Sequence, residues 1–153
     1  MNRARVLACK DDRYAKYSNY LASKSVTKHI LLIEDNKSDV ALIKRMLRDS
    51  FSGYELEFYD VSRMSDALQM LDSNSFDLAI LDLSLIDIEG TAAVSAFHSQ
   101  APNIPIVVHT GSQCPNLRQE AMMCGAKHCM IKGRESPFSF KFMIEQALEN
   151  ATA

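Results

Sequence analysis

Short apolar runs alternate with amphipathic stretches along most of this chain. The runs are either continuously apolar or alternate in steps of two, as buried and half-buried strands do, and they lie at residues 29–33, 54–59, 77–82, 106–108 and 128–131. The stretches between them repeat apolar residues at helical spacing, as Val40, Ile43 and Leu47 do. This alternation predicts an α/β fold, in which a doubly wound, five-stranded parallel sheet carries helices on both faces.

Capping and turn residues indicate where the helices begin. Ser38 or Asp39 is expected to cap the first helix, and Pro115 is expected in the first turn of the fourth. The final helix should span about residues 136–150. At roughly 100° per residue, Phe142 falls outside the apolar stripe of that helix and should face outward.

Composition and charge narrow the class of protein. With 153 residues, 47% of them hydrophobic and 24% charged, the chain is expected to form one globular domain. No apolar run approaches the roughly 20 residues of a membrane-spanning helix. The four cysteines lack paired metal-site spacing, which favours a protein of the reducing cytoplasm.

The charge is distributed unevenly along the chain. Residues 1–28 contain seven Lys/Arg and two Asp/Glu, whereas the remainder contains ten and seventeen. We therefore expect a flexible basic extension at residues 1–27, followed by one domain at 28–153. The acidic body of the domain does not fit a nucleic-acid-binding protein.

Polar residues follow four of the predicted strands directly. They are Glu34 and Asp35 after the first strand, Asp82 after the third, Thr110 after the fourth and Lys132 after the fifth. Carboxyl ends of parallel strands meet at one edge of the sheet, where open α/β folds bind ligands. Three neighbouring carboxylates repel one another unless a cation neutralises them, and Mg²⁺ prefers such oxygen ligands. The set predicts phosphoryl chemistry, with Asp82 as a carboxylate nucleophile.

The same residues lie in motifs that resemble the receiver domain of two-component response regulators. The resemblance covers about residues 28–150, and its pieces are ILLIEDN, LAILDLSL with IDIEG, IVVHTG and GAKHCMIKG, in that order. It implies a flavodoxin-like sheet with strand order 2-1-3-4-5, dependence on Mg²⁺, and an aspartyl phosphate formed from a phosphohistidine. Carried over to this sequence, the resemblance makes Asp82 the phosphoacceptor, Asp35 a direct metal ligand, Glu34 a ligand through water, the Ser84 main-chain carbonyl a further ligand, and Thr110 and Lys132 the contacts of the phosphoryl group.

The sequence departs from the family pattern at three positions. The aromatic switch residue of the family lies three positions before the lysine, where this chain has Cys129. Gly133 replaces the proline that usually follows the lysine, and Ile86 replaces the usual proline of the loop after the acceptor. None of these changes removes a chemical group from the site. Thr110, Cys129 and Phe142 are the positions expected to transmit the signal.

The expected protein is a stand-alone receiver without a DNA-binding output domain. It would take a phosphoryl group from a histidine kinase or a histidine phosphotransfer protein, then contact a downstream protein or pass the group on. Beyond its own phosphorylation and slow dephosphorylation, it would not be an enzyme. Because Phe142 lies on the last helix, which belongs to the output face of receivers, a homodimer is a further candidate assembly.

Two other readings of the sequence stay open. A pseudo-receiver would keep the fold and bind partners without phosphorylation. Cys129 and Gly133 favour it, whereas the intact Asp35, Asp82 and Lys132 argue against it. An unrelated α/β phosphoryl-transfer enzyme is the second, but a phosphatase of the haloacid-dehalogenase type requires an aspartate two residues after the nucleophile, where this chain has Ser84. A flavodoxin does not fit, since the acidic residues 34–35 would repel the phosphate of FMN.

Overall fold

A computed structural model describes residues 26–48 and 54–151 of the chain. Its strands are β1 (Val26–Ile33), β2 (Tyr54–Val61), β3 (Leu78–Leu81), β4 (Ile106–Thr110) and β5 (His128–Ile131). Its helices are α2 (Lys37–Arg48), α3 (Met64–Met70), α4 (Ala92–Gln100), α5 (Leu117–Met123) and α6 (Pro137–Asn150). Strands and helices alternate throughout this part of the chain, as the sequence predicts.

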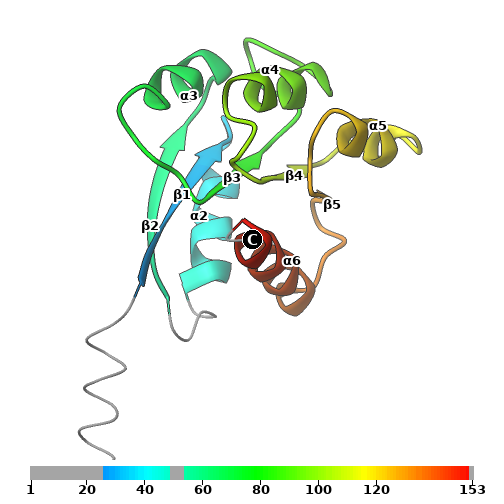
Figure 1. The fold of residues 1–153 in the computed structure, drawn as a ribbon. Coiled ribbons are helices and arrows are strands. Elements are labelled where there is room, and N and C mark those ends of the chain that lie inside the picture. Colours follow the sequence, from blue (N-terminus) through cyan, green and yellow to red (C-terminus); the bar gives the residue numbers. More distant parts are fainter. Residues whose placement is uncertain (1–25, 49–53, 152–153) are drawn as a thin grey trace, which may run out of the picture.

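The five strands form one parallel sheet in the order β2-β1-β3-β4-β5 (Figure 1). Strand β1 pairs with β2 over its whole length and with β3 over its last four residues. The connection from β2 to β3 crosses over β1, so the direction of the connections reverses between β1 and β3. In such sheets this reversal separates the loops that follow neighbouring strands and leaves room for a ligand.

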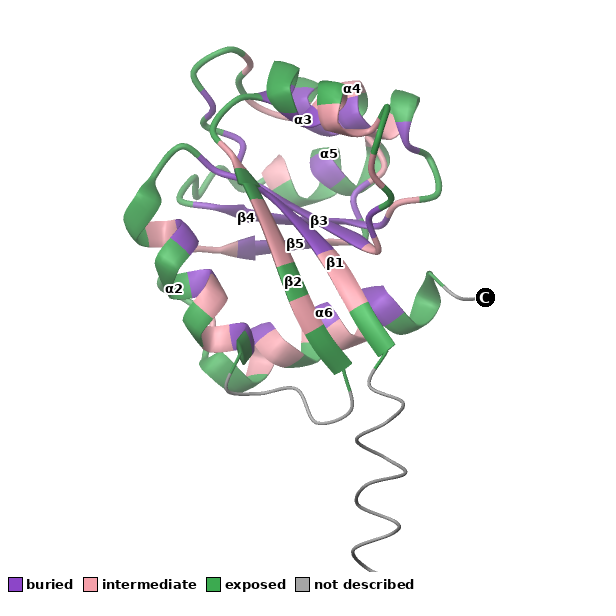
Figure 2. Ribbon diagram, turned by 90° about the vertical axis from the view of Figure 1, so that its left-hand side faces the viewer, coloured by how far each residue is buried: buried purple, intermediate pink, exposed green. Residues whose placement is uncertain are grey.

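Helices cover both faces of the sheet (Figure 2). On one face, Leu31, Ala79 and Val108 share a core with residues of α3, α4 and α5. On the other face, Ile30 and Ile80 pack with buried residues of α2 and α6. Successive residues of a strand point to opposite faces, so each central strand needs apolar residues in sequence. The continuous apolar runs therefore have their explanation in this two-sided core.

Three local expectations need correction. Helix α2 is capped by Asn36, whose side-chain oxygen accepts from the backbone N–H groups of Ser38 at 2.9 Å and Asp39 at 3.3 Å. The cap therefore precedes the two predicted residues, because the helix begins as soon as the chain leaves β1. Pro115 lies two residues before α5 rather than in its first turn. Strand β1 begins at Val26, so residues 26–27 belong to the sheet, whereas the rest of the expected extension lies outside the described residues.

The last helix has the predicted orientation. Phe140 is buried against the sheet, and Phe142 is 50% exposed. None of the helices in the described part of the chain combines the length and the apolar character that crossing a membrane requires.

Candidate acidic site

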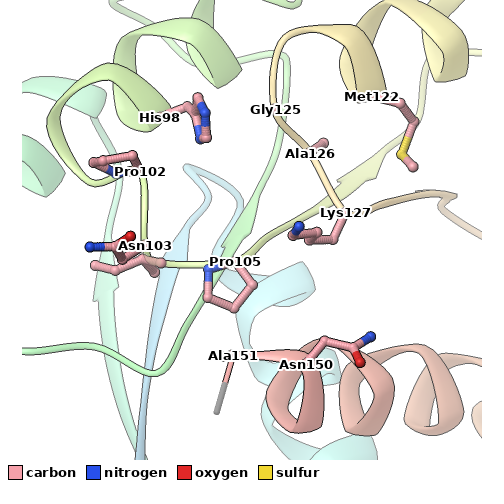
Figure 3. Close-up of a pocket in the computed structure, with 11 residues that line it drawn as sticks. His98, Pro102, Asn103, Pro105, Met122, Gly125, Ala126, Lys127, Asn150 and Ala151 are labelled. Carbon is pink, nitrogen blue, oxygen red and sulfur yellow. The ribbon is translucent and has the colours of Figure 1, made fainter. Parts of the chain in front are cut away.

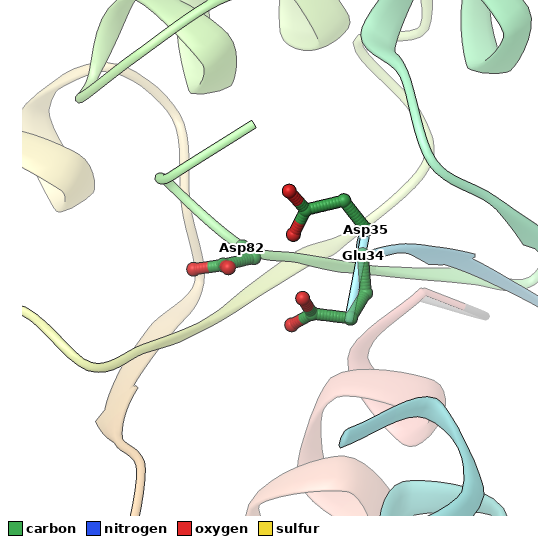
Figure 4. Close-up of side chains that lie close together, drawn as sticks. All are labelled: Glu34, Asp35 and Asp82. Atoms are coloured by element: carbon green, nitrogen blue, oxygen red, sulfur yellow. The ribbon is translucent and has the colours of Figure 1, made fainter. Parts of the chain in front are cut away.

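Three carboxylates meet where β1 and β3 end (Figure 4). Glu34 and Asp35 follow β1, Asp82 follows β3, and the pairing of Ile33 with Leu81 brings the two chain segments level. One oxygen from each of the three carboxylates lies within 4.8 Å of the others. Glu34 and Asp82 are buried, whereas Asp35 is exposed. The predicted acidic residues therefore do form one cluster.

Lys132 reaches this cluster from the end of β5. Its Nζ donates to Glu34 Oε2 at 2.7 Å and to Asp82 Oδ2 at 3.1 Å. It also donates to Asp39 Oδ2 at 2.9 Å, a contact that joins residues 93 positions apart. Burial by itself would lower the pKa of Lys132, but the hydrogen bonds to Glu34 and Asp39 outweigh it and raise that pKa well above its usual value.

Asp39 is a site residue that the sequence by itself did not reveal. In the sequence it is a candidate helix cap, since an acid in the first turn of a helix is an ordinary partner of the helix dipole. Its only local signal is its spacing. It lies four residues after Asp35, in the first turn of α2, so its side chain can reach back to the end of β1.

The cluster is short of positive charge. Burial raises the pKa of Glu34, and the hydrogen bonds from Lys132 and from the Asn36 backbone N–H only partly oppose this. Asp82 Oδ1 is buried and has no hydrogen-bond partner within the described structure. One ammonium faces several carboxylates, and a buried, unpaired carboxylate oxygen is costly. The donor set therefore fits a hard divalent cation such as Mg²⁺.

Thr110 and His109 end β4 and point to different faces of the sheet. Thr110 is fully buried, and its hydroxyl accepts from the Ser112 backbone N–H at 3.4 Å. The Thr110 carbonyl accepts from the Lys132 backbone N–H at 2.8 Å, which fixes the chain that carries the lysine. His109 packs edge-on against Phe140 with ring centroids 5.3 Å apart, and burial lowers its pKa. His109 is therefore a packed residue of the strand end.

The loop after Asp82 is closed on itself and tied to a neighbouring helix. The Gly90 N–H donates to the Leu83 carbonyl at 2.7 Å, and Ser84 forms an antiparallel bridge with Glu89. At the tip of the loop, the Asp87 carboxylate accepts from the first two backbone N–H groups of α3 at 3.0 and 2.9 Å. These hydrogen bonds lower the pKa of Asp87. Asp87 thus caps α3 from 22–23 residues away, a role that no local pattern indicates.

A hollow of about 250 Å³ lies beside Cys129 under the loop that joins β4 to α5. Cys129 is 8% exposed, and burial raises the pKa of its thiol, so the thiol stays protonated at neutral pH. Cys129 thus behaves as a small apolar residue of the core. Gly133, which follows the lysine, has a φ of +79°, a left-handed conformation that glycine adopts readily.

A larger hollow, of about 540 Å³, opens at the opposite edge of the sheet (Figure 3). It lies where β4 and β5 begin and where α4 and α6 end, and His98, Lys127 and Asn150 contribute polar groups to it. None of the described residues that line it is acidic. It is therefore separate from the acidic site at the carboxyl ends of the strands.

Comparison with known proteins agrees with this geometry. The family described as response regulator receiver domain matches residues 30–137. The transcriptional regulatory protein ZraR of Salmonella typhimurium is 27% identical over 124 residues, which make up 81% of this chain and 26% of ZraR. The chain thus spans about a quarter of the length of this curated relative.

Two solved structures share the fold. One is a CheY-like response regulator receiver domain protein from Methanospirillum hungatei, with 25% identity, a TM-score of 0.69, and coverage of 82% of this chain and 97% of the other. The second is the phosphorylated cyanobacterial phytochrome response regulator RcpA, with 25% identity, a TM-score of 0.62, and coverage of 82% and 93%. Because the family match covers most of the chain and the strand order is the expected one, this chain belongs to the receiver domain family of two-component response regulators.

Proposed function

We propose that this receiver domain accepts a phosphoryl group on Asp82 and uses it to control protein contacts. The observation that carries the proposal is the position of Lys132, whose ammonium contacts both Asp82 and Glu34 in the acidic cluster. A lysine and several carboxylates at one sheet edge match the requirements of phosphoryl transfer, in which positive charge stabilises the transferring group. The description of RcpA as phosphorylated supports the same assignment by similarity.

Mg²⁺ is the cofactor that this donor set favours. Asp35, Asp82 and the Ser84 main-chain carbonyl would hold it directly, and Glu34 would hold it through water. When bound, the ion would neutralise part of the charge on the phosphoryl oxygens.

The residues of the chain supply the remaining parts of the reaction. An oxygen of Asp82 forms the new O–P bond, while the N–P bond of the donor phosphohistidine breaks and its electron pair stays on the imidazole. Lys132 Nζ contacts the Asp82 carboxylate. In the reaction it would donate to an oxygen of the transferred group. The hydroxyl of Thr110, buried at the end of the adjacent strand, donates to another. A histidine kinase or a histidine phosphotransfer protein would be the donor.

Acetyl phosphate with Mg²⁺ tests this function directly. Intact-protein mass spectrometry should show the gain of one phosphoryl group on the wild type and none on Asp82→Asn. Asp66→Asn, which removes an exposed acid from the first turn of α3, is the matched control and should still be phosphorylated. No mass gain on the wild type would refute the proposal and leave the pseudo-receiver, a protein that binds partners without phosphorylation, as the better description.

For the output surface we propose the exposed face of α6. Phe138 and Phe142 lie one helical turn apart and are 79% and 50% exposed, which places two aromatic rings side by side on the surface. A downstream protein or a second copy of the chain would cover them. Phe142→Ala should weaken such an assembly, as measured by light scattering and partner binding on the phosphorylated protein. Unchanged mass and binding would exclude Phe142 from the output surface.

Cys129 would alter how phosphorylation reaches that surface. A cysteine side chain leaves unfilled the hollow of about 250 Å³ beside it, where the family pattern has an aromatic ring. We therefore propose that Thr110 transmits the effect of phosphorylation through repacking of the loop between β4 and α5 rather than through rotation of an aromatic ring.

A further inference from the structure

We infer that Asp39 is a positioning residue that retains the Lys132 ammonium and thereby limits how tightly the site holds a phosphoryl group on Asp82. The inference rests on the proposed function, because it concerns the lysine that would contact the phosphoryl group. Asp39 itself would touch neither the phosphoryl group nor the metal ion.

The contacts of Lys132 use its whole donor capacity. An ammonium group has three N–H donors, and Lys132 Nζ has three carboxylate acceptors, on Glu34, Asp82 and Asp39, at 2.7, 3.1 and 2.9 Å. A phosphoryl oxygen can therefore become a fourth acceptor only if one of the present hydrogen bonds breaks. Each hydrogen bond that holds the ammonium on a carboxylate therefore opposes the binding of a phosphoryl group.

Asp39 differs from the other two acceptors in its position. Glu34 and Asp82 belong to the acidic cluster together with Asp35, so their oxygens would also serve a bound cation. Asp39 comes from α2 and is not part of that cluster. It therefore remains as a partner of Lys132 when the other two carboxylates engage a cation, and it competes with a phosphoryl oxygen for the ammonium.

The exposure of the pair sets the size of the effect. The side chains of Lys132 and Asp39 are 21% and 29% exposed, so solvent screens their attraction in part. Asp39 should therefore adjust the properties of the site rather than abolish its function. Its removal is expected to change the affinity for a phosphoryl analogue by about two- to fivefold, the range of partly exposed ion pairs.

The test compares Asp39→Asn with Asp66→Asn. Both substitutions remove an acid from the first turn of a helix, so they remove the same interaction with the helix dipole, but only Asp39 contacts Lys132. Calorimetry measures the affinity for Mg²⁺ and, at saturating Mg²⁺, the affinity for beryllofluoride, which mimics a phosphoryl group on a carboxylate. Each variant is also made in a Lys132→Met background, which gives a double-mutant cycle.

The expected result for Asp39→Asn is a split between the two affinities. Beryllofluoride should bind about two- to fivefold tighter, because the ammonium is no longer shared with Asp39. Mg²⁺ should bind more weakly, since Lys132 then engages Glu34 and Asp82 more strongly. A purely structural defect would weaken both. In the Lys132→Met background, Asp39→Asn should no longer change the affinity for beryllofluoride. If the change came from the removed charge acting at long range, it would persist in that background.

A second measurement needs neither metal nor phosphoryl group. The ¹⁵N signal of the Lys132 ammonium reports how fast its protons exchange with water, and exchange should be faster in Asp39→Asn than in the wild type or in Asp66→Asn. Equal exchange rates, or equal shifts in beryllofluoride affinity with and without Lys132, would overturn the role of Asp39. Failure of both the wild type and Asp39→Asn to bind beryllofluoride would instead overturn the proposed phosphoacceptor function.

Discussion

Removal of the Lys132 charge should destabilise the folded protein, because the acidic site then lacks its cation. In Lys132→Met, Glu34 and Asp82 lose their cationic partner while their side chains remain only 3% and 5% exposed. Loss of one partner from a buried ion pair destabilises a protein by about 3–5 kcal/mol, because the remaining charge is buried without compensation. Lys132 itself is 21% exposed, so we expect the lower end of this range, about 3 kcal/mol.

The loss should depend on Mg²⁺. In the wild type, Lys132 and a cation compete for the same carboxylates, so the variant should bind Mg²⁺ more tightly than the wild type does. Mg²⁺ stabilises the folded state of both proteins, so at saturation the difference in stability between them shrinks by RT ln of the ratio of their Kd values, about 1.4 kcal/mol for a tenfold ratio. Part of the stability lost in EDTA should therefore return at saturating Mg²⁺.

Urea unfolding, followed by circular dichroism in EDTA and in Mg²⁺, measures both effects as differences in unfolding free energy. Lys127→Met is the matched control, since Lys127 is exposed, precedes β5 directly and has no ion pair within the described part of the chain. It should change stability little in either buffer. A loss below about 1 kcal/mol for Lys132→Met in EDTA, the value of a surface ion pair, would refute the reasoning. So would a loss of the same size in both buffers.

Three further predictions concern the core, the pH dependence and the acceptor loop. Phe140→Ala should destabilise the protein by about 3–5 kcal/mol, because Phe140 is 1% exposed, whereas Phe142→Ala should cost less than about 1 kcal/mol in the same urea titration. In EDTA, the contribution of Glu34 to the free energy of unfolding should be fully present below its unfolded pKa of 4.5 and disappear as the pH rises through its raised folded pKa. Glu34→Gln should remove this decline, and an unchanged pH profile of stability in the variant would contradict the prediction. Asp87→Ala should lower stability near neutral pH, and the difference should shrink as the pH falls below 3.8 through the lowered folded pKa; a difference that is independent of pH would contradict the capping role.

The sequence by itself determined where the strands lie along the chain and which residues follow them. Strands buried on both faces must be apolar throughout, so a polar residue directly after the apolar run, such as Asp82 or Lys132, marks the point where the strand leaves the core. Parallel strands end at the same edge, so the polar residues that follow them were bound to gather once the fold class was known. The strand order itself came from the resemblance to receiver domains, and the structure confirms it.

The tertiary structure alone decided which side chains touch within that edge. Asn36, Ser38 and Asp39 all favour helix caps, and only the path of the chain out of β1 selects Asn36. This choice leaves Asp39 free to pair with Lys132. Likewise, Asp87 lies in the loop after the acceptor, yet it caps a helix that begins more than twenty residues earlier.

The physical reason is the range of the signals. Burial and periodicity repeat along neighbouring residues, so the sequence displays them directly. A hydrogen bond between Asp39 and Lys132 depends on the relative placement of α2 and β5, which the packing of the whole sheet sets across 93 residues. The sequence thus determined that Asp82 would meet carboxylates and a lysine, and the folded structure decided that a fourth acid shares that lysine.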